Sequence, residues 1–159
     1  MTYDPPAPAI YTLIAAAITA DSVLGVGGDH AVSLQKLPAT GEDDPVVYLG
    51  VSNPYLGLSV EPTGGESLGN SIWSRDVEIK VKICYDCEPP ITAREKVEAM
   101  LTRVQDVIDG LDGGLLSTGQ QFILHEAPAQ ISTRQPTKSK TTVFGTYSVT
   151  GYAMRVQAG

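Results

Sequence analysis

The residues best suited to chemistry are the chain's only two cysteines, Cys84 and Cys87, which stand in a CxxC spacing. Such a pair can supply half of a structural zinc site or form a redox-active dithiol. A four-ligand zinc site would also need both histidines of the chain, His30 and His125. Zinc motifs usually bring both ligand pairs at short spacing, and these histidines are far apart. We therefore expect no metal and no cofactor.

Local geometry also argues against a thiol site. If Cys84 and Cys87 both lie on a strand, a separation of three residues places them on opposite faces. A thioredoxin-like pair gains its low thiol pKa partly from a helix N-terminus. The next helix is expected to begin only near Thr92, beyond Pro89 and Pro90. The two cysteines are interpreted as small residues at a strand end, and a small metal or thiol protein using them is kept as an alternative.

Other catalytic patterns give no support for an enzyme. The segment 25–28 is rich in glycine but lacks the Lys-Ser/Thr ending of a phosphate-binding loop. No serine sits in a nucleophile elbow. Asp43 and Asp44, beside glycine and proline, are typical of a solvated turn. The sequence therefore predicts a protein that is not an enzyme.

Charge is distributed unevenly along the chain. The 159 residues carry a formal net charge of −7, and residues 1–70 hold eight acids and one base. Residues 71–159 hold ten acids and ten bases. Tight nucleic-acid binding needs clustered Lys and Arg, so the balance favours a surface that nucleic acid passes without binding. No apolar run approaches the 18 residues of a membrane-spanning helix, and we expect no membrane partner.

The periodicity of apolar residues predicts two helices and four strands in a single domain, 1–159. Helices are expected at 9–20 and from Thr92, where Glu95 completes a capping box, to 109. Strands are expected at 46–52, 73–85, 121–126 and 143–156, and 73–85 alternates apolar and polar residues. Long loops are expected at 53–71 and 128–142. This order indicates an α+β fold with a mostly antiparallel β-sheet packed against two α-helices.

The arrangement resembles one known family. The strand RDVEIKVKICY (75–85) is followed by a turn and the helical segment AREKVEAML (93–101). Before them come DSVLG (21–25), a "D-x-x-L-G"-like pattern, and DPVVYL (44–49), and a long apolar strand ends the chain. In this order the chain, from Ile10 to Val156, resembles the tail terminator proteins of tailed bacteriophages, also called tail completion or head–tail joining proteins.

The resemblance implies a structural virion protein. Such a protein forms a hexameric ring at the head-proximal end of the tail tube, assembled in the host cytoplasm and located at the tail–neck junction. It stops tube polymerisation and contacts the tail tube protein and a neck or head-completion protein, while DNA passes through the channel without specific binding. Another neck, stopper or tail-tube subunit is the alternative within the same class.

The long loops are the expected arms toward neighbouring subunits or partners. Arg134, Lys138 and Lys140 form a basic loop without an interleaved aromatic, which suits a solvated loop or an arm that meets an acidic partner. The candidate contact residues are Tyr55, Leu56, Leu58, Trp73, Arg134, Lys138 and Lys140.

Overall fold

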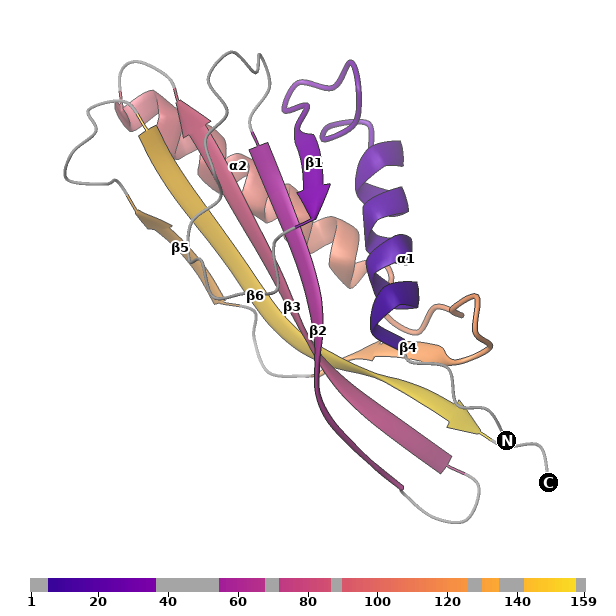
Figure 1. Cartoon of the computed structure of the whole chain (residues 1–159). Helices are drawn as coiled ribbons and strands as arrows, with labels where there is room; N and C mark the ends of the chain where they lie inside the picture. Colours follow the sequence, from indigo (N-terminus) through magenta and orange to yellow (C-terminus); the bar gives the residue numbers. More distant parts are fainter. Residues whose placement is uncertain are drawn as a thin grey trace.

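A computed structural model describes residues 6–36, 55–67, 72–86, 90–125, 130–134 and 142–156. In chain order the elements are α1 (Pro6–Ala20), β1 (Ser33–Lys36), β2 (Tyr55–Ser67), β3 (Ile72–Asp86), α2 (Pro90–Asp109), β4 (Gln121–Leu124), β5 (Gln130–Arg134) and β6 (Thr142–Val156). The long strands β2, β3 and β6 form the middle of one curved sheet, and the short strands flank them (Figure 1). The α+β fold predicted from the sequence is confirmed.

The sheet is mixed but mostly antiparallel. In the described residues its order is β1-β2-β3-β6, and both β4 and β5 pair with the remaining edge of β6. β5 pairs with Phe144–Ser148 and β4 with Gly151–Met154. Every pair is antiparallel except β1 with β2, which is parallel.

Both helices cover the same face of the sheet (Figure 1). α1 packs on β2, whereas α2 packs on β6 and β3. Every second residue of β3 points into this layer, and these residues, Val77, Ile79, Val81 and Ile83, are fully buried. The core is completed by the apolar stripes of the helices, for example Ile10, Ile14 and Ile18 of α1. No helix among the described residues is long and apolar enough to cross a membrane.

A glycine permits the close approach of α2 to β6. A Cβ atom at Gly145 would lie 2.4 Å from Val97 Cγ1 and 2.8 Å from Leu101 Cδ1. Both distances are shorter than ordinary van der Waals contact, so any larger side chain would push α2 away from the sheet.

The strongly periodic segments agree well with the sequence-based prediction. The strand expected at 73–85 spans Ile72–Asp86, and the strand expected at 143–156 spans Thr142–Val156. The first helix and the short strand near 121 are also confirmed, with small differences at their ends. The strand expected at 46–52 lies outside the described residues.

Three local expectations were wrong. The loop expected at 53–71 is largely strand β2, which pairs with β3 from Tyr55 opposite Cys84 to Ser67 opposite Trp73. The loop expected at 128–142 contains strand β5, while residues 135–141 lie outside the described part. α2 begins at Pro90, so Thr92 is inside the helix and is not its N-cap. Proline suits the first helical turn because its missing N–H would have no partner there.

Candidate functional site

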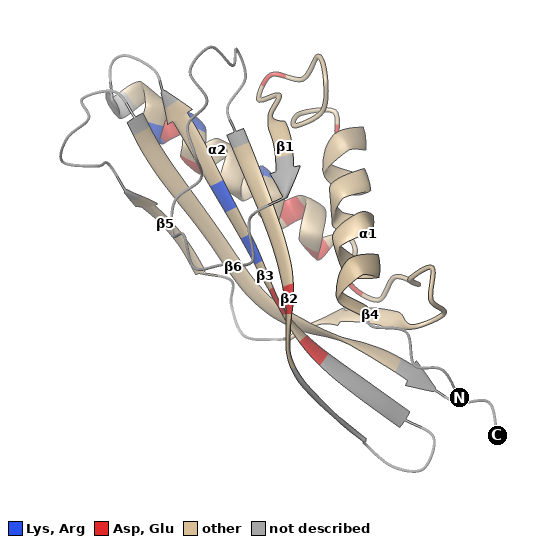
Figure 2. Cartoon of the chain, viewed as in Figure 1, with Lys and Arg blue, Asp and Glu red and all other residues tan. Residues whose placement is uncertain are grey.

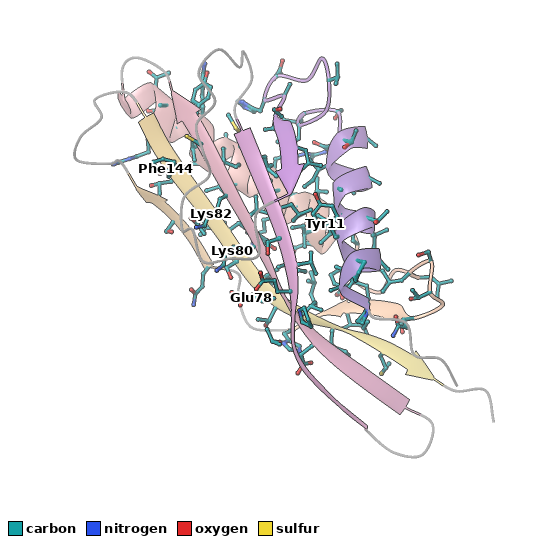
Figure 3. The ribbon with its side chains drawn as sticks, viewed as in Figure 1. Tyr11, Glu78, Lys80, Lys82 and Phe144 are labelled. Carbon is teal, nitrogen blue, oxygen red and sulfur yellow. The ribbon has the colours of Figure 1, made fainter. Side chains whose placement is uncertain are left out.

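The face of the sheet that points away from both helices is polar, and we call it the open face. Its half-buried and exposed residues include Ser59, Glu61, Asp76, Glu78, Lys80, Lys82, Phe144, Thr146, Ser148, Thr150 and Tyr152, whereas Cys84, on the same side of β3, is buried. These residues alternate with core residues along β2, β3 and β6, because successive side chains of a strand point to opposite faces. Figure 3 shows Glu78, Lys80 and Lys82 in one row along β3.

Charge changes sign along this row. Lys82 and Lys80 occupy one part of β3, and Glu78 and Asp76 follow toward the other end of the face (Figure 2). Glu61 of β2 stands directly opposite Glu78, so two like charges are neighbours across the strands. Opposed like charges destabilise a sheet slightly, and the acidic end therefore favours a cationic partner.

Glu78 is partly compensated within the chain. Its carboxylate Oε1 lies 3.9 Å from Lys80 Nζ and accepts a hydrogen bond of 3.5 Å from Ser148 Oγ. The side chains of Lys80 and Glu78 are 43% and 40% exposed, and ion pairs so accessible to water contribute roughly 0–1 kcal/mol. Lys82 has no carboxylate partner among the described residues. At the lysine end of the open face, the described residues thus give a carboxylate partner to Lys80 alone.

A small cluster around His125 joins β4 to the acidic end of the open face. His125 Nδ1 is 2.9 Å from Thr150 Oγ1, and its Nε2 is 3.9 Å from Asp76 Oδ1. The imidazole also packs against the ring of Tyr152, with centroids 5.2 Å apart. The side chains of His125 and Asp76 are 37% and 42% exposed, so water screens this pair. We interpret the cluster as a structural contact that holds the end of β4 against β3 and β6.

The sheet has two edges without a strand partner in the described part of the chain. One edge is formed by β1 and by β2 beyond Leu58, and the other is formed by β5 and β4, of which β4 also makes backbone hydrogen bonds with Gly113 and Gly114. β1 and β2 run parallel, and the three pairings from β2 through β3 and β6 to β5 are antiparallel, so β1 and β5 run in opposite directions. β5 carries Ile131, whose side chain is 42% exposed. Open strand edges are templates for pairing with another chain.

The residues predicted as partner contacts are distributed differently from the expectation. Leu56 and Leu58 are fully buried, because they lie on the side of β2 that α1 covers. Their side chains therefore have no surface for another subunit in this structure. Of the other five candidate contact residues, three lie on strands and two lie outside the described residues.

Tyr55 and Trp73 lie on β2 and β3, and Arg134 lies on β5 opposite Phe144. The side chains of these three residues lie outside the described part of the structure, as do Lys138 and Lys140 entirely. Of the predicted basic loop, only Arg134 is thus assigned a position, at the lysine end of the open face.

The cysteine pair is described only in part. Cys84 lies on β3 with 4% of its surface exposed, and Cys87 lies outside the described residues. Among the residues that the structure describes, no group of three or more His, Cys, Asp and Glu side chains could hold a metal ion.

One partly buried charge pair was not predicted from the sequence. The carboxylate of Asp21, just after α1, accepts hydrogen bonds from the backbone N–H groups of Val23 and Leu24, each at 3.1 Å. It also accepts three hydrogen bonds from the guanidinium of Arg103 on α2, 82 residues away. The hydrogen bond from Arg103, together with the two backbone N–H groups, lowers the pKa of Asp21 to about 2. The pair fixes the end of α1 to α2.

Comparison with known proteins shows a similar fold. No protein-family model and no curated protein matches the sequence. A solved structure described as "Virion of native gene transfer agent (GTA) particle" contains a chain with the same fold, at a TM-score of 0.54 and 18% sequence identity. The match covers 98% of this chain and 100% of that chain, so the shared fold extends over the whole length of both.

Proposed function

We propose that the chain is a structural protein of a phage-like virion and, more specifically, a tail terminator. The observation that carries this proposal is the fold match with a virion chain, which leaves almost no part of either chain uncovered. The sequence resemblance to tail terminators supports the finer assignment. In this role the protein lies at the tail–neck junction, ends the polymerisation of the tail tube and joins the tail to the neck. It has no enzymatic activity.

The edges of the sheet suit a closed ring of identical subunits. β5 of one copy can pair in antiparallel orientation with β1, or with the unpaired part of the β2 edge, in the next copy, because these edges run in opposite directions. The same head-to-tail contact then repeats around the ring until it closes. The resemblance to tail terminators gives six as the expected number of subunits.

The open face suits the wall of a channel through which DNA moves. Its β6 residues Thr146, Ser148 and Thr150 carry short hydroxyl side chains. Its described charged residues are two lysines at one end and three acids at the other, and the chain as a whole is acidic, so few basic groups hold phosphates. DNA would therefore slide past without specific binding.

Two alternatives remain. Another neck, stopper or tail-tube subunit would have the same fold and similar charge. A tube subunit would polymerise along its axis, whereas a terminator would stop at one ring. The different-class alternative is a metal or thiol protein based on Cys84 and Cys87, which would retain zinc on purification.

Native mass spectrometry of the purified protein, with and without a chelator, distinguishes the proposal from these alternatives. A single ring-sized species without bound metal, unaffected by chelator, is the expected result. A monomer that carries zinc and loses it to the chelator would overturn the proposal in favour of the thiol class. A ladder of increasing multiples would favour a tube subunit.

The edge contact can be tested by a charge on β5. Ile131→Asp is expected to abolish the ring and leave a folded monomer, because the aspartate disfavours strand pairing at an edge but removes no core contact. Glu98→Gln, at an exposed position of α2, is the matched control and should keep the ring. A ring that persists with Ile131→Asp would exclude β5 from the interface.

A further inference from the structure

The two edges of the sheet are open at different levels along the strands. β1 pairs with residues 55–58 of β2, and the rest of β2 has no partner on this side in the described part of the chain (Figure 1). On the other side β5 pairs with residues 144–148 of β6 and leaves its outer edge open. β4 is less open, because Phe122 makes backbone hydrogen bonds with the loop before it. The edges best placed to accept a strand are therefore that of β5 and the free stretch of β2, residues 59–67.

The charges at these two edges are complementary. Arg134 is the only charged residue of the β5 sequence, and its strand position lies on the side of the open face. Glu61 lies on the same side in the free stretch of β2, is exposed, and has no basic partner among the described residues. Glu61 also stands directly opposite Glu78, where the two carboxylates repel. A guanidinium beside Glu61 would replace this repulsion by attraction.

Arg134 and Glu61 cannot meet within one chain. β3 and β6 lie between β2 and β5, so three strand spacings of about 4.8 Å separate the two edges. The two residues also lie at different levels of β3. Arg134 is aligned through β6 with Cys84, and Glu61 is aligned with Glu78, which is six residues or about 20 Å further along. The arginine can therefore reach this glutamate only in another copy of the chain.

Strand length and charge distinguish β2 from β1 as the acceptor. β5 has five residues, whereas β1 has four. On the side of the open face β1 offers only Ser33 and Gln35, and neither carries a charge that would attract Arg134. The free stretch of β2 is nine residues long and contains acids. It can pair with all of β5 and also provide the opposite charge.

Only one alignment on β2 satisfies both requirements. With Arg134 opposite Glu61, an antiparallel β5 runs along residues 61–65 and stays within β2. With Arg134 opposite Glu66, the other acid of the free stretch, β5 would run past the end of β2 at Ser67. With Arg134 opposite Ser59, the arginine would stand next to Lys80 of β3, where like charges repel.

We infer that β5 of one copy adds as an antiparallel strand to the free edge of β2 in the next copy, with Arg134 opposite Glu61 of that copy. This inference rests on the ring contact of the proposed function and adds the edge, the register and the ion pair that select it. Antiparallel addition keeps directly opposite side chains on one face, so the open faces of the two copies become continuous. The lysine end of one open face then lies level with the acidic end of the next.

The backbone of the β2 edge makes this contact selective. Pro62 follows Glu61 and has no N–H, so an arbitrary strand forms fewer backbone hydrogen bonds here. The charge of the added strand consequently has more weight. In the inferred alignment the exposed Ile131 of β5 lies beside Gly64, which has no side chain to obstruct it.

Charge reversal tests the ion pair. Glu61→Arg and Arg134→Glu should each abolish the ring in native mass spectrometry, because each places like charges opposite one another. The double variant Glu61→Arg/Arg134→Glu should recover the ring. Glu98→Arg makes the same change of charge at an exposed position of α2 and should keep it. Circular dichroism verifies that each variant is folded.

Disulfide formation tests the register in a chain that carries Cys87→Ser. Glu61→Cys with Arg134→Cys places two Cβ atoms about 4.5–5.5 Å apart across the contact, close to the separation in a disulfide. Oxidation should link copies into covalent multimers up to the size of the ring, whereas each single variant should stop at a dimer. The control pair Ser59→Cys with Arg134→Cys should give few multimers, because diagonal positions are about 7–8 Å apart.

The outcomes separate this inference from the proposed function. A ring that persists with Glu61→Arg, or multimers that form better with Ser59→Cys than with Glu61→Cys, would overturn the register. A ring of the unchanged chain without cross-linking at either pair would assign the contact to other edges, and the proposed function would stand. Failure of the proposed function has a different signature: the unchanged chain would form an open ladder of multiples or retain zinc, whichever cysteine pair reacts.

Discussion

The two faces of β3 are formed by the same fifteen residues but have different roles. On the helix side Val77, Ile79, Val81 and Ile83 are fully buried and fixed by close packing. On the open face Glu78, Lys80 and Lys82 remain partly exposed, and the ion pair between Glu78 and Lys80 is worth little in water. The inner face therefore explains how the chain folds, whereas the described charged residues of the open face contribute little to folding and remain accessible to solvent.

The largest expected effect comes from a pair of adjacent substitutions on β6 that separates the two faces. Gly145→Val adds a side chain where even a Cβ atom would lie 2.4 Å from Val97 Cγ1. We expect it to lower the free energy of unfolding by about 3 kcal/mol or more, because overpacking a filled core costs roughly 1–3 kcal/mol and a β-branched residue adds further bulk. Chemical denaturation followed by circular dichroism measures this change.

The matched control is Thr146→Val, one residue away on the open face. It places the same side chain where no helix packs and should change the free energy of unfolding by less than about 0.5 kcal/mol. Equal destabilisation by the two variants would contradict the distinction between the faces.

The same contrast explains which elements could be predicted from the sequence. β3 and α2 follow a strong alternation or a continuous apolar stripe, so their positions emerge from the sequence with small errors at the ends. β2 contains Gly57, Pro62, Gly64 and Gly65, which are typical of a loop. Its strand conformation is imposed by pairing with β3, and an irregularity between Pro62 and Gly64 accommodates the proline.

The candidate site could be predicted from the sequence only along β3, where polar and apolar residues alternate. The residue types of β3 alternate so regularly that they place Glu78, Lys80 and Lys82 on one polar face. The contact between Asp21 and Arg103 is tertiary, because 82 residues separate the two. The sequence pattern at 21–25 contains the aspartate but gives no indication of its partner. The glycines and the proline of β2 made this segment resemble a loop. Its leucines, Leu56 and Leu58, were therefore expected on a surface loop although they belong to the core.

A smaller effect is expected from substitution of Asp21, whose carboxylate connects the end of α1 to Arg103 of α2. The pKa of Asp21 is about 2 in the folded protein, below its ordinary value of 3.8. The ionised carboxylate thus stabilises the fold fully above pH 3.8, and this contribution is lost as the pH falls from 3.8 to 2. Asp21→Asn should lower the Tm at pH 7 by roughly 3–8 °C, because it weakens the loop cap and the contact with Arg103.

Thermal unfolding between pH 7 and pH 2 checks this prediction. The difference in Tm between the unchanged protein and Asp21→Asn should narrow below pH 3.8 and become smallest near pH 2. Asp29→Asn, at an exposed position of the same loop, is the control substitution. A constant difference at all pH values would show that the ionisation of Asp21 does not stabilise the fold.

The smallest expected effect concerns a polar atom buried on the helix side of β6. Tyr147 is fully buried, and among the described residues its hydroxyl has no hydrogen-bond partner. Tyr147→Phe removes this unsatisfied group without leaving a large cavity, so we expect the free energy of unfolding to stay the same or rise by up to about 1 kcal/mol. A fall of more than about 1 kcal/mol would show that the hydroxyl has a partner that stabilises the fold.

The stability of Tyr147→Phe at alkaline pH provides a more specific test of the buried hydroxyl. Burial, together with the negative charge of Asp109, raises the pKa of Tyr147 well above its ordinary value of 10.0. The stability that depends on the neutral phenol is complete below about pH 10 and is lost as the pH rises further, because the unfolded chain ionises first. Tyr147→Phe should therefore lose less stability than the unchanged protein between about pH 10 and pH 11, as measured by urea denaturation. Tyr152→Phe, on the partly exposed open face, is the control substitution.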